Sequence, residues 1–235
     1  MSSNIEFTKE ILDKSLTVLG KEFRKRNGKK MPADIILIGG ASVLINYGFR
    51  EMTTDADAVI RASSVMREAI HCVADKLDLP RDWLNDDFKR TDSYTENLSK
   101  VAKSYRTFSN VLHVRTVSAE YLIAMKLMSG RQYKYDLSDV VGILSEHDKR
   151  GEPISRKMID MAVKELYEDQ PLPTISTQLL DDVFNSEDYV LIYNKIRKIE
   201  TQGKEYLLEF HKEYTDVRGV KADDIIERAR QKAKK

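Results

Sequence analysis

Two aspartates set two residues apart carry the strongest chemical signal in this sequence. Asp55 and Asp57 lie in the run TTDADAVI, which we predict to be a strand. Residues i and i+2 of a strand point to the same face and lie about 6.6 to 6.8 Å apart along the chain. Carboxylate oxygens are the hard ligands that Mg²⁺ and Mn²⁺ prefer, and Mg²⁺ completes its octahedron with water and substrate phosphates. The pair therefore predicts a divalent metal site that acts on a phosphorylated substrate.

A pair of glycines precedes the aspartates. Gly39 and Gly40 follow the apolar run IILI, which is typical of a strand buried on both faces. We predict a turn at the glycines, which adopt backbone angles closed to other residues, and then a helix over residues 41–47. The N–H groups and the positive dipole end of that helix would lie beside the turn, where they favour anions such as phosphate.

Two threonines directly precede Asp55. Thr53 and Thr54 have hydroxyl groups that would donate to bound phosphates, or they simply favour the strand. Each half of the pattern is common on its own, but the order and spacing of glycines, helix and carboxylates together form a stronger signal. The sequence therefore predicts a nucleoside triphosphate site over this stretch.

The glycine pair, the short helix and Thr53-Thr54-Asp55-Ala56-Asp57 resemble the signature of the nucleotidyltransferase (polymerase-beta-like) superfamily. Within it, the chain most resembles minimal bacterial nucleotidyltransferases related to the AbiEii/AbiGii-type toxins of toxin–antitoxin and phage-defence systems. The runs WLND at 83–86, YLIAMKL at 121–127 and KYDLSD at 134–139 agree with this resemblance. It implies an α/β (α+β) fold in which helices flank a small mixed sheet.

The resemblance also implies a reaction. A nucleoside monophosphate would move from a nucleoside triphosphate to an acceptor, and pyrophosphate would be released. Asp55 and Asp57 would hold the metal, while Gly39, Gly40 and Ser42 would cradle the β- and γ-phosphates. The implied acceptor is the end of a transfer RNA or a protein side chain, with an antibiotic hydroxyl as a further option. A cognate antitoxin is an implied partner.

A second group of charged residues lies further along the chain. In the related group an arginine–lysine–aspartate cluster lies beside the active site, so the resemblance implies that Lys126 and Arg131 contact the triphosphate and that Asp136 orients Lys126 or the acceptor. Two alternatives stay open. Lys126 can extend its stem along the core and expose its amine. Asp136, three residues before Asp139 on one helix face, can serve as a helix cap.

The predicted strand over residues 111–117 departs from the superfamily pattern. Many members have a third metal-binding carboxylate on such a strand, whereas this one offers His113 and Arg115. Glu120 would substitute for it, or is an acid at a helix N-terminus. The departure supports the hypothesis of a catalytically silent nucleotidyltransferase fold that serves as an antitoxin or binding module. A structural coincidence in an unrelated α/β protein is a separate alternative.

Composition sets outer limits on these hypotheses. The formal net charge of +1 gives no global attraction to nucleic acid, so RNA would have to bind a local patch. The one cysteine excludes an internal disulfide framework and fits a reducing cytoplasm. No apolar run reaches the roughly 18 residues that would indicate a membrane span. We therefore expect a soluble cytoplasmic protein without membrane contact.

The run Gly151-Glu152-Pro153 marks the expected domain boundary. It separates a nucleotidyltransferase core at residues 1–150 from a helical C-terminal region at 151–235. We predict helices in that region near residues 155–168, 175–184, 187–214 and 222–233.

Overall fold

The computed structural model describes residues 7–29, 31–53, 56–186, 188–213 and 221–233. The chain forms two compact units, of which the first comprises residues 1–122 and 162–168 and the second comprises residues 123–161 and 169–235. Their limits fall inside two continuous helices, α5 (Ala119–Ser129) and α7 (Arg156–Tyr167). The domain boundary near residue 150 stays a prediction.

The first unit is built on a five-stranded mixed sheet, counted over the described residues, with the strand order β3-β2-β1-β5-β4. The central strand β1 is antiparallel to β2 and parallel to β5, while β3 is parallel to β2 and β4 is antiparallel to β5. This arrangement confirms the predicted α/β fold. The strands are β1 (Ala33–Leu37), β2 (Ala56–Arg61), β3 (Leu84–Asn85), β4 (Lys103–Phe108) and β5 (Leu112–Thr116).

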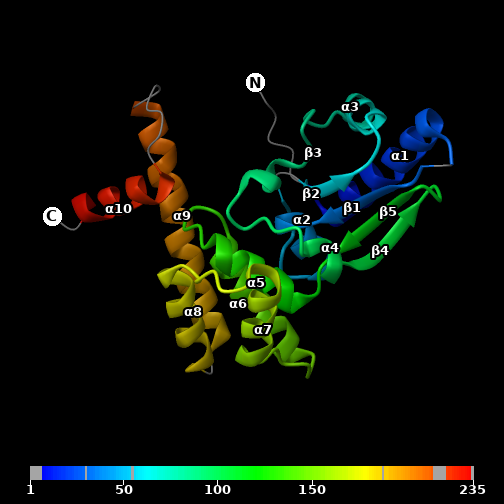
Figure 1. Cartoon of the computed structure of the whole chain (residues 1–235). Coiled ribbons are helices and arrows are strands. Elements are labelled where there is room, and N and C mark those ends of the chain that lie inside the picture. Colours follow the sequence, from blue (N-terminus) through cyan, green and yellow to red (C-terminus); the bar gives the residue numbers. More distant parts are fainter. Residues whose placement is uncertain (1–6, 30, 54–55, 187, 214–220, 234–235) are drawn as a thin grey trace. The chain divides into compact units, whose positions relative to one another are not determined.

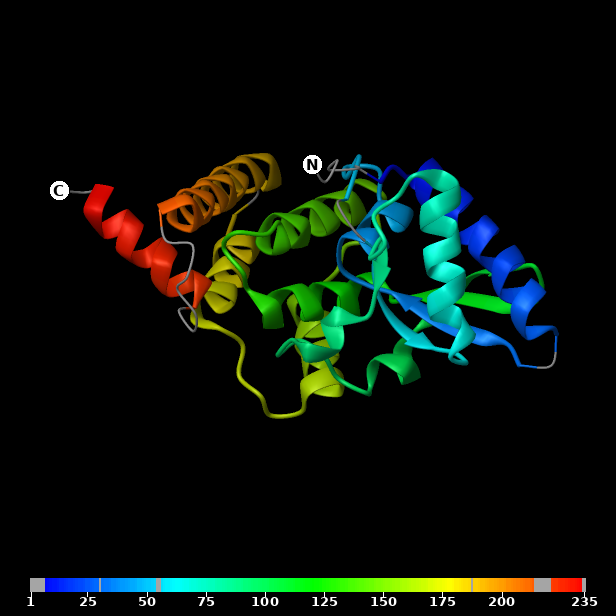
Figure 2. The same cartoon turned by 90° about the horizontal axis from the view of Figure 1, so that it is seen from above.

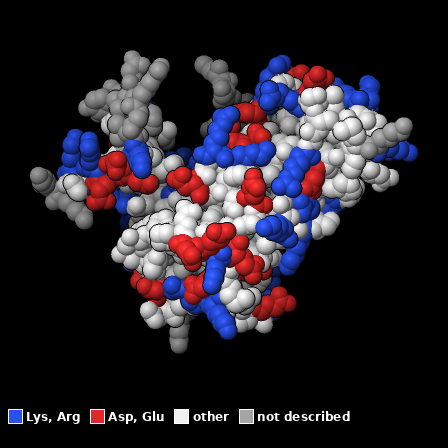
Figure 3. All heavy atoms as spheres, in the orientation of Figure 1, with Lys and Arg blue, Asp and Glu red and all other residues white. Residues whose placement is uncertain are grey.

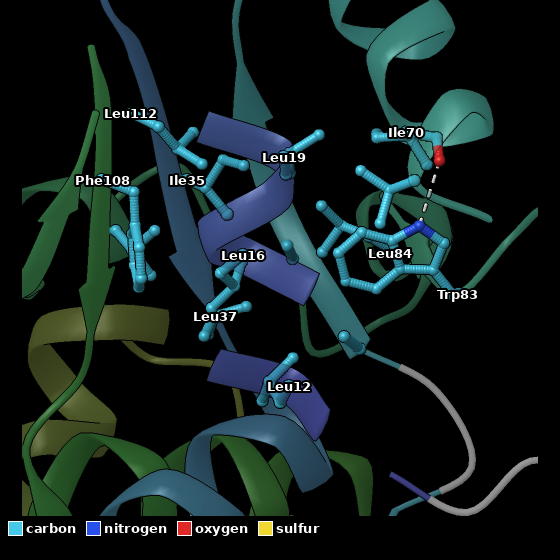
Figure 4. Close-up of a cluster of buried hydrophobic side chains, with 14 of the residues drawn as sticks. Leu12, Leu16, Leu19, Ile35, Leu37, Ile70, Trp83, Leu84, Phe108 and Leu112 are labelled. Carbon is cyan, nitrogen blue, oxygen red and sulfur yellow. Dashed lines mark hydrogen bonds between the residues drawn. The ribbon is translucent and has the colours of Figure 1, made fainter. Parts of the chain in front are cut away.

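Two long helices pack side by side against one face of the sheet, α1 (Lys9–Asn27) and α3 (Val65–Leu77) (Figures 1 and 2). In α1, leucines at intervals of three and four residues form an apolar stripe on the helix face that meets the sheet. Ile35 and Leu37 of β1 meet them because alternate strand residues point to the same face. The leucines, shown in Figure 4, are Leu12, Leu16 and Leu19, all fully buried.

Trp83 anchors the connection between α3 and β3. Its side chain is buried, its Nε1–H donates to the carbonyl of Ile70 at 3.2 Å (Figure 4), and its ring stacks on Phe7. Trp83 therefore has a packing role. The remaining helices of this unit are α2 (Gly39–Asn46), a 3₁₀ turn η1 (Asp87–Arg90) and α4 (Leu98–Val101).

The second unit is helical. The long helix α9 packs along α6, and α10 packs against α9 through a small cluster that includes Leu207, Ile225 and Ile226. The helices beyond residue 150 begin and end within two residues of their predicted limits, which confirms the helical C-terminal region. The helices not yet given are α6 (Asp136–Lys149), α8 (Thr174–Phe184), α9 (Tyr189–Glu213) and α10 (Ala222–Ala233).

Candidate nucleotide site

Helix α2 begins earlier than predicted. The turn expected at Gly39 and Gly40 is wrong, because both glycines are already the first residues of α2. Ile38 is extended, and Gly39 has a φ of +56°, which only glycine adopts without strain. The backbone therefore passes from strand β1 into the helix within one residue, and the first N–H groups of α2 are left at the end of the sheet.

The carboxylate of Asp57 lies against this helix start. A Cβ atom added to Gly39 would be 3.3 Å from Asp57 Oδ2. The β1–β2 ladder causes this proximity, since Leu37 pairs with Ala58 and the N–H of Ile38 donates to the carbonyl of Asp57 at 3.1 Å. The first N–H groups of a helix have no intrahelical partner. The structure thus places a half-buried carboxylate beside donors that suit an anion.

Asp55 and Thr54 lie outside the described residues, so the predicted pair of carboxylates is represented by Asp57 alone. Over the described part of the chain, no group of three or more His, Cys, Asp or Glu side chains is placed to hold a metal. The oxygen donors of Asp57 match the preference of Mg²⁺ and Mn²⁺, which usually take few protein ligands and complete their shell with water and phosphate. The donor chemistry at the start of α2 therefore fits such an ion.

A cation that the sequence analysis did not select lies beside Gly40. A Cβ atom added there would be 2.8 Å from Arg50 Nη2 and 2.5 Å from Thr53 Oγ1. Arg50 is half-buried, and its Nε donates to the carbonyl of Met52 at 3.1 Å. An arginine three residues before the TTDAD run was the available signal, but only the fold brings its guanidinium to the glycine pair. Arg50 is therefore a candidate phosphate ligand.

Ser42 has a structural partner in this protein. Its side chain is buried, and its hydroxyl lies 2.6 Å from Thr116 Oγ1. Asn46 Nδ2 donates to the same Thr116 oxygen at 3.0 Å. These bonds tie α2 to the end of β5, and the predicted contact of Ser42 with phosphate stays a prediction.

The charged side chains on and after β5, where many superfamily members have a third metal-binding carboxylate, have structural partners. Arg115 on β5 forms a two-point ion pair with Asp34 of β1, at 2.8 and 2.6 Å. His113 is exposed, with its Nδ1 3.1 Å from Thr107 Oγ1 on β4. Glu120 accepts a hydrogen bond from the Ser118 hydroxyl at 2.7 Å in the first turn of α5, which agrees with an acid at a helix N-terminus.

The second unit brings four of the predicted charged residues together. Lys126 Nζ lies 2.9 Å from Asp136 Oδ1 and 2.8 Å from Asp139 Oδ2. Arg131 Nε lies 2.8 Å from Asp136 Oδ2. The side chain of Lys126 is only 7% exposed, so the alternative in which its amine reaches the surface is wrong. We call these four residues the Lys126 cluster.

Charges in the Lys126 cluster balance, with two cations against two carboxylates. Burial by itself would raise the pKa of Asp136, but the nearby charges of Lys126 and Arg131 outweigh it and hold that pKa well below its usual range. Asp136 is therefore ionised at neutral pH. It bridges Lys126 and Arg131 as the first residue of α6.

A further buried carboxylate, which the sequence analysis missed, caps helix α6. Glu200 of α9 accepts from the N–H of Leu137 at 2.8 Å, from the N–H of Ser138 at 3.3 Å and from the Ser138 hydroxyl at 2.5 Å. Burial raises the pKa of Glu200 to about 7. No local pattern signals this role, because the capped helix begins more than sixty residues earlier in the chain.

A cavity of about 630 Å³ opens beside the C-terminal end of β2, between α3 and the segment around β3. Its lining includes the apolar residues Ile60, Met66, Ile70 and Leu84 together with polar and charged side chains. None of the predicted site residues lines it, counted over the described residues. This cavity is therefore separate from the start of α2.

A family model described as a nucleotidyltransferase of unknown function (DUF6036) matches residues 14–146, more than half of the chain. The chain belongs to this family. The match contains the start of α2, Asp57 and the whole Lys126 cluster, and it ends within α6. Searches of curated proteins and of solved structures gave no match.

Two further observations concern the surface of this nucleotidyltransferase family member. Across the described ranges, no helix has the length and apolarity needed to cross a membrane. On the face shown in Figure 3, basic and acidic side chains are interspersed. This mixture agrees with the net charge of +1.

Proposed function

We propose that this protein is a metal-dependent nucleotidyltransferase that moves a nucleoside monophosphate from a nucleoside triphosphate to an acceptor. The observation that carries the proposal is the carboxylate of Asp57 against Gly39 at the start of α2. A carboxylate beside a helix N-terminus suits a phosphate chain together with its bound cation. Membership of the nucleotidyltransferase family supports the same chemistry.

In this proposal each group at the start of α2 has a binding role. Asp57 and Asp55 would hold Mg²⁺ or Mn²⁺, which when bound supplies charge neutralisation of the triphosphate. The first N–H groups of α2 and the guanidinium of Arg50 bind the β- and γ-phosphates. The acceptor hydroxyl oxygen forms a bond to the α-phosphorus, the bond from that phosphorus to the bridging oxygen breaks, pyrophosphate leaves and the hydroxyl proton passes to water.

By the same resemblance, the Lys126 cluster has a role in the proposed reaction. Lys126 and Arg131 supply positive charge for the triphosphate, and Asp136 orients both of them. The resemblance of residues 83–86 and 121–127 to the AbiEii-type group supports a toxin-like role with a transfer RNA end or a protein as acceptor. That role would include control by a cognate antitoxin.

The test is incubation of the purified protein with each α-labelled nucleoside triphosphate, Mg²⁺ or Mn²⁺, and either total transfer RNA or cell lysate. We expect label in RNA or protein, and a loss of at least about 100-fold in Asp57→Asn, because the variant lacks the metal-binding charge. Asp75→Asn, at an exposed position on α3, is the matched control and should transfer normally. Full transfer by folded Asp57→Asn would refute the proposed chemistry.

The Lys126 cluster also favours a second candidate, a catalytically silent nucleotidyltransferase fold that binds nucleotide. The observation that supports this candidate is that Asp136 and Asp139 neutralise the charge of Lys126 within the protein. A lysine paired in this way has less charge to offer a triphosphate. Binding of a nucleoside triphosphate by calorimetry, without transfer of label to RNA, protein or small-molecule acceptors, would favour this candidate.

A further inference from the structure

The segment 131–138 carries most of the Lys126 cluster, and helices α9 and α10 contact it at successive residues. Arg230 of α10 donates from Nη1 to Gln132 Oε1 at 2.5 Å. The carboxylate of Asp223, also on α10, accepts a hydrogen bond from the backbone of Gln132. Both the side chain and the backbone of the residue next to Arg131 are therefore bonded to α10.

Helix α9 makes an equally close approach. At Gly203 a Cβ atom would collide with the backbone carbonyl oxygen of Gln132. Only a glycine lets α9 lie this near to the segment. One residue further, Tyr133 packs against the apolar cluster that α9 and α10 form around Leu207 and Ile226.

The rest of the segment is held by α9. The guanidinium of Arg197 lies 3.2 Å from the centre of the Tyr135 ring, a cation–π contact. Glu200 then caps α6 at Leu137 and Ser138. The residues on both sides of Asp136 are therefore fixed by a helix that comes more than fifty residues later in the chain.

The contact between Arg230 and Gln132 leaves another nitrogen of the Arg230 guanidinium buried. Its Nη2 is buried and has no hydrogen-bond partner among the described residues. Burying an unpaired donor is unfavourable, so the contact with Gln132 is not explained by stability alone. The placement fits a requirement for a fixed position of Gln132.

We propose that α10 is a positioning element for the triphosphate-binding cluster. Arg230 and Gly203 are positioning residues that act through Gln132 on Arg131 and Asp136. The part of this inference that concerns the triphosphate rests on the proposed function. The C-terminal helices lie beyond the residues matched by the family model.

Hydrogen exchange followed by mass spectrometry on the full chain tests the positioning directly, without any need for activity. In Arg230→Met and in Gly203→Ala we expect the amides of residues 131–138 to exchange at least about tenfold faster, because local opening becomes easier. The matched controls are Arg228→Met and Lys204→Ala, at exposed neighbouring positions, and they should exchange like the wild type. Unchanged exchange of 131–138 in folded Arg230→Met would overturn the inference, even where exchange of α10 itself rises.

Kinetics separate positioning from a purely structural role. We expect Arg230→Met to raise KM for the nucleoside triphosphate several-fold with kcat within about twofold, since it acts on ground-state binding, and Arg230→Lys to recover part of the loss. Equal KM values for Arg230→Met and Arg228→Met would overturn the link to the triphosphate. If the wild type transfers no nucleotide, the proposed function fails, while the exchange result still decides whether α10 positions the segment. If Gly203→Ala does not fold, Arg230→Met decides alone.

Discussion

The start of α2 and the Lys126 cluster differ in how deeply their charged side chains are buried. Beside the glycine pair, Asp57 and Arg50 are half-buried and lie at the N-terminal end of a helix. In the Lys126 cluster two cations share ion pairs with two carboxylates, and Lys126 and both aspartates are buried while Arg131 is partly exposed. A helix N-terminus with a carboxylate and a guanidinium beside it suits a phosphate and its cation, whereas a charge-balanced network also fixes the elements that carry it. We therefore expect the loss of a charge to weaken ligand binding at both places and to destabilise the fold mainly at the cluster.

Removal of the buried lysine tests this comparison most strongly. Lys126→Met leaves Asp136 and Asp139 buried with one cation fewer, so we expect a loss of about 3–5 kcal/mol in the free energy of unfolding, as for other broken buried ion pairs. Urea unfolding measures it, with Lys149→Met, at an exposed position on α6, as the control. A loss below about 1 kcal/mol with much weaker triphosphate binding would show that the ion pairs of Lys126 contribute little to the fold and that its charge serves the ligand.

The pH dependence of stability tests the cap on α6. The pKa of Glu200 is raised to about 7, above its ordinary value of 4.5, so the folded state holds this proton more tightly than the unfolded state. The stability that protonated Glu200 contributes is complete below pH 4.5 and is lost as pH rises to about 7. The loss amounts to about 3 kcal/mol at 1.36 kcal/mol per pKa unit.

Urea unfolding at several pH values between 4.5 and 7.5 measures this loss as the difference between wild type and Glu200→Gln, which cannot ionise at that position. Glu205→Gln, at an exposed position on α9, should keep the wild-type slope. Parallel curves for wild type and Glu200→Gln would contradict the assignment.

The smallest expected change in stability concerns Gly39, the first residue of α2. Gly39→Ala forces a side chain into a positive φ and places a Cβ atom 3.3 Å from Asp57 Oδ2, so we expect a loss of about 1–2 kcal/mol in stability. Urea unfolding measures it against Gly48→Ala, where a Cβ atom would meet nothing within 4 Å. Equal stabilities of the two variants would show that the conformation at Gly39 is not required.

Much of the fold was predictable because its signals are local. The apolar run at residues 35–38 and the leucine stripe of α1 lie within one element each, so the periodicity of the sequence indicates strand and helix directly. Strand β4 was not predicted. Its side chains are mostly exposed, so they show no apolar alternation. The strand is stabilised by its pairing with β5, which a local sequence pattern does not indicate.

The sequence by itself indicated most of the elements, the family-like order of glycines and carboxylates, and the candidate residues Asp57, Lys126, Arg131 and Asp136. Only the tertiary structure decided what these residues contact. It placed Asp57 at Gly39 through strand pairing and paired Lys126 with both carboxylates of α6. It also brought Glu200 and Arg230 to the segment around Asp136. The physical reason is that periodicity and turn chemistry act over a few residues, whereas the pairing of charges depends on which distant elements share a buried space.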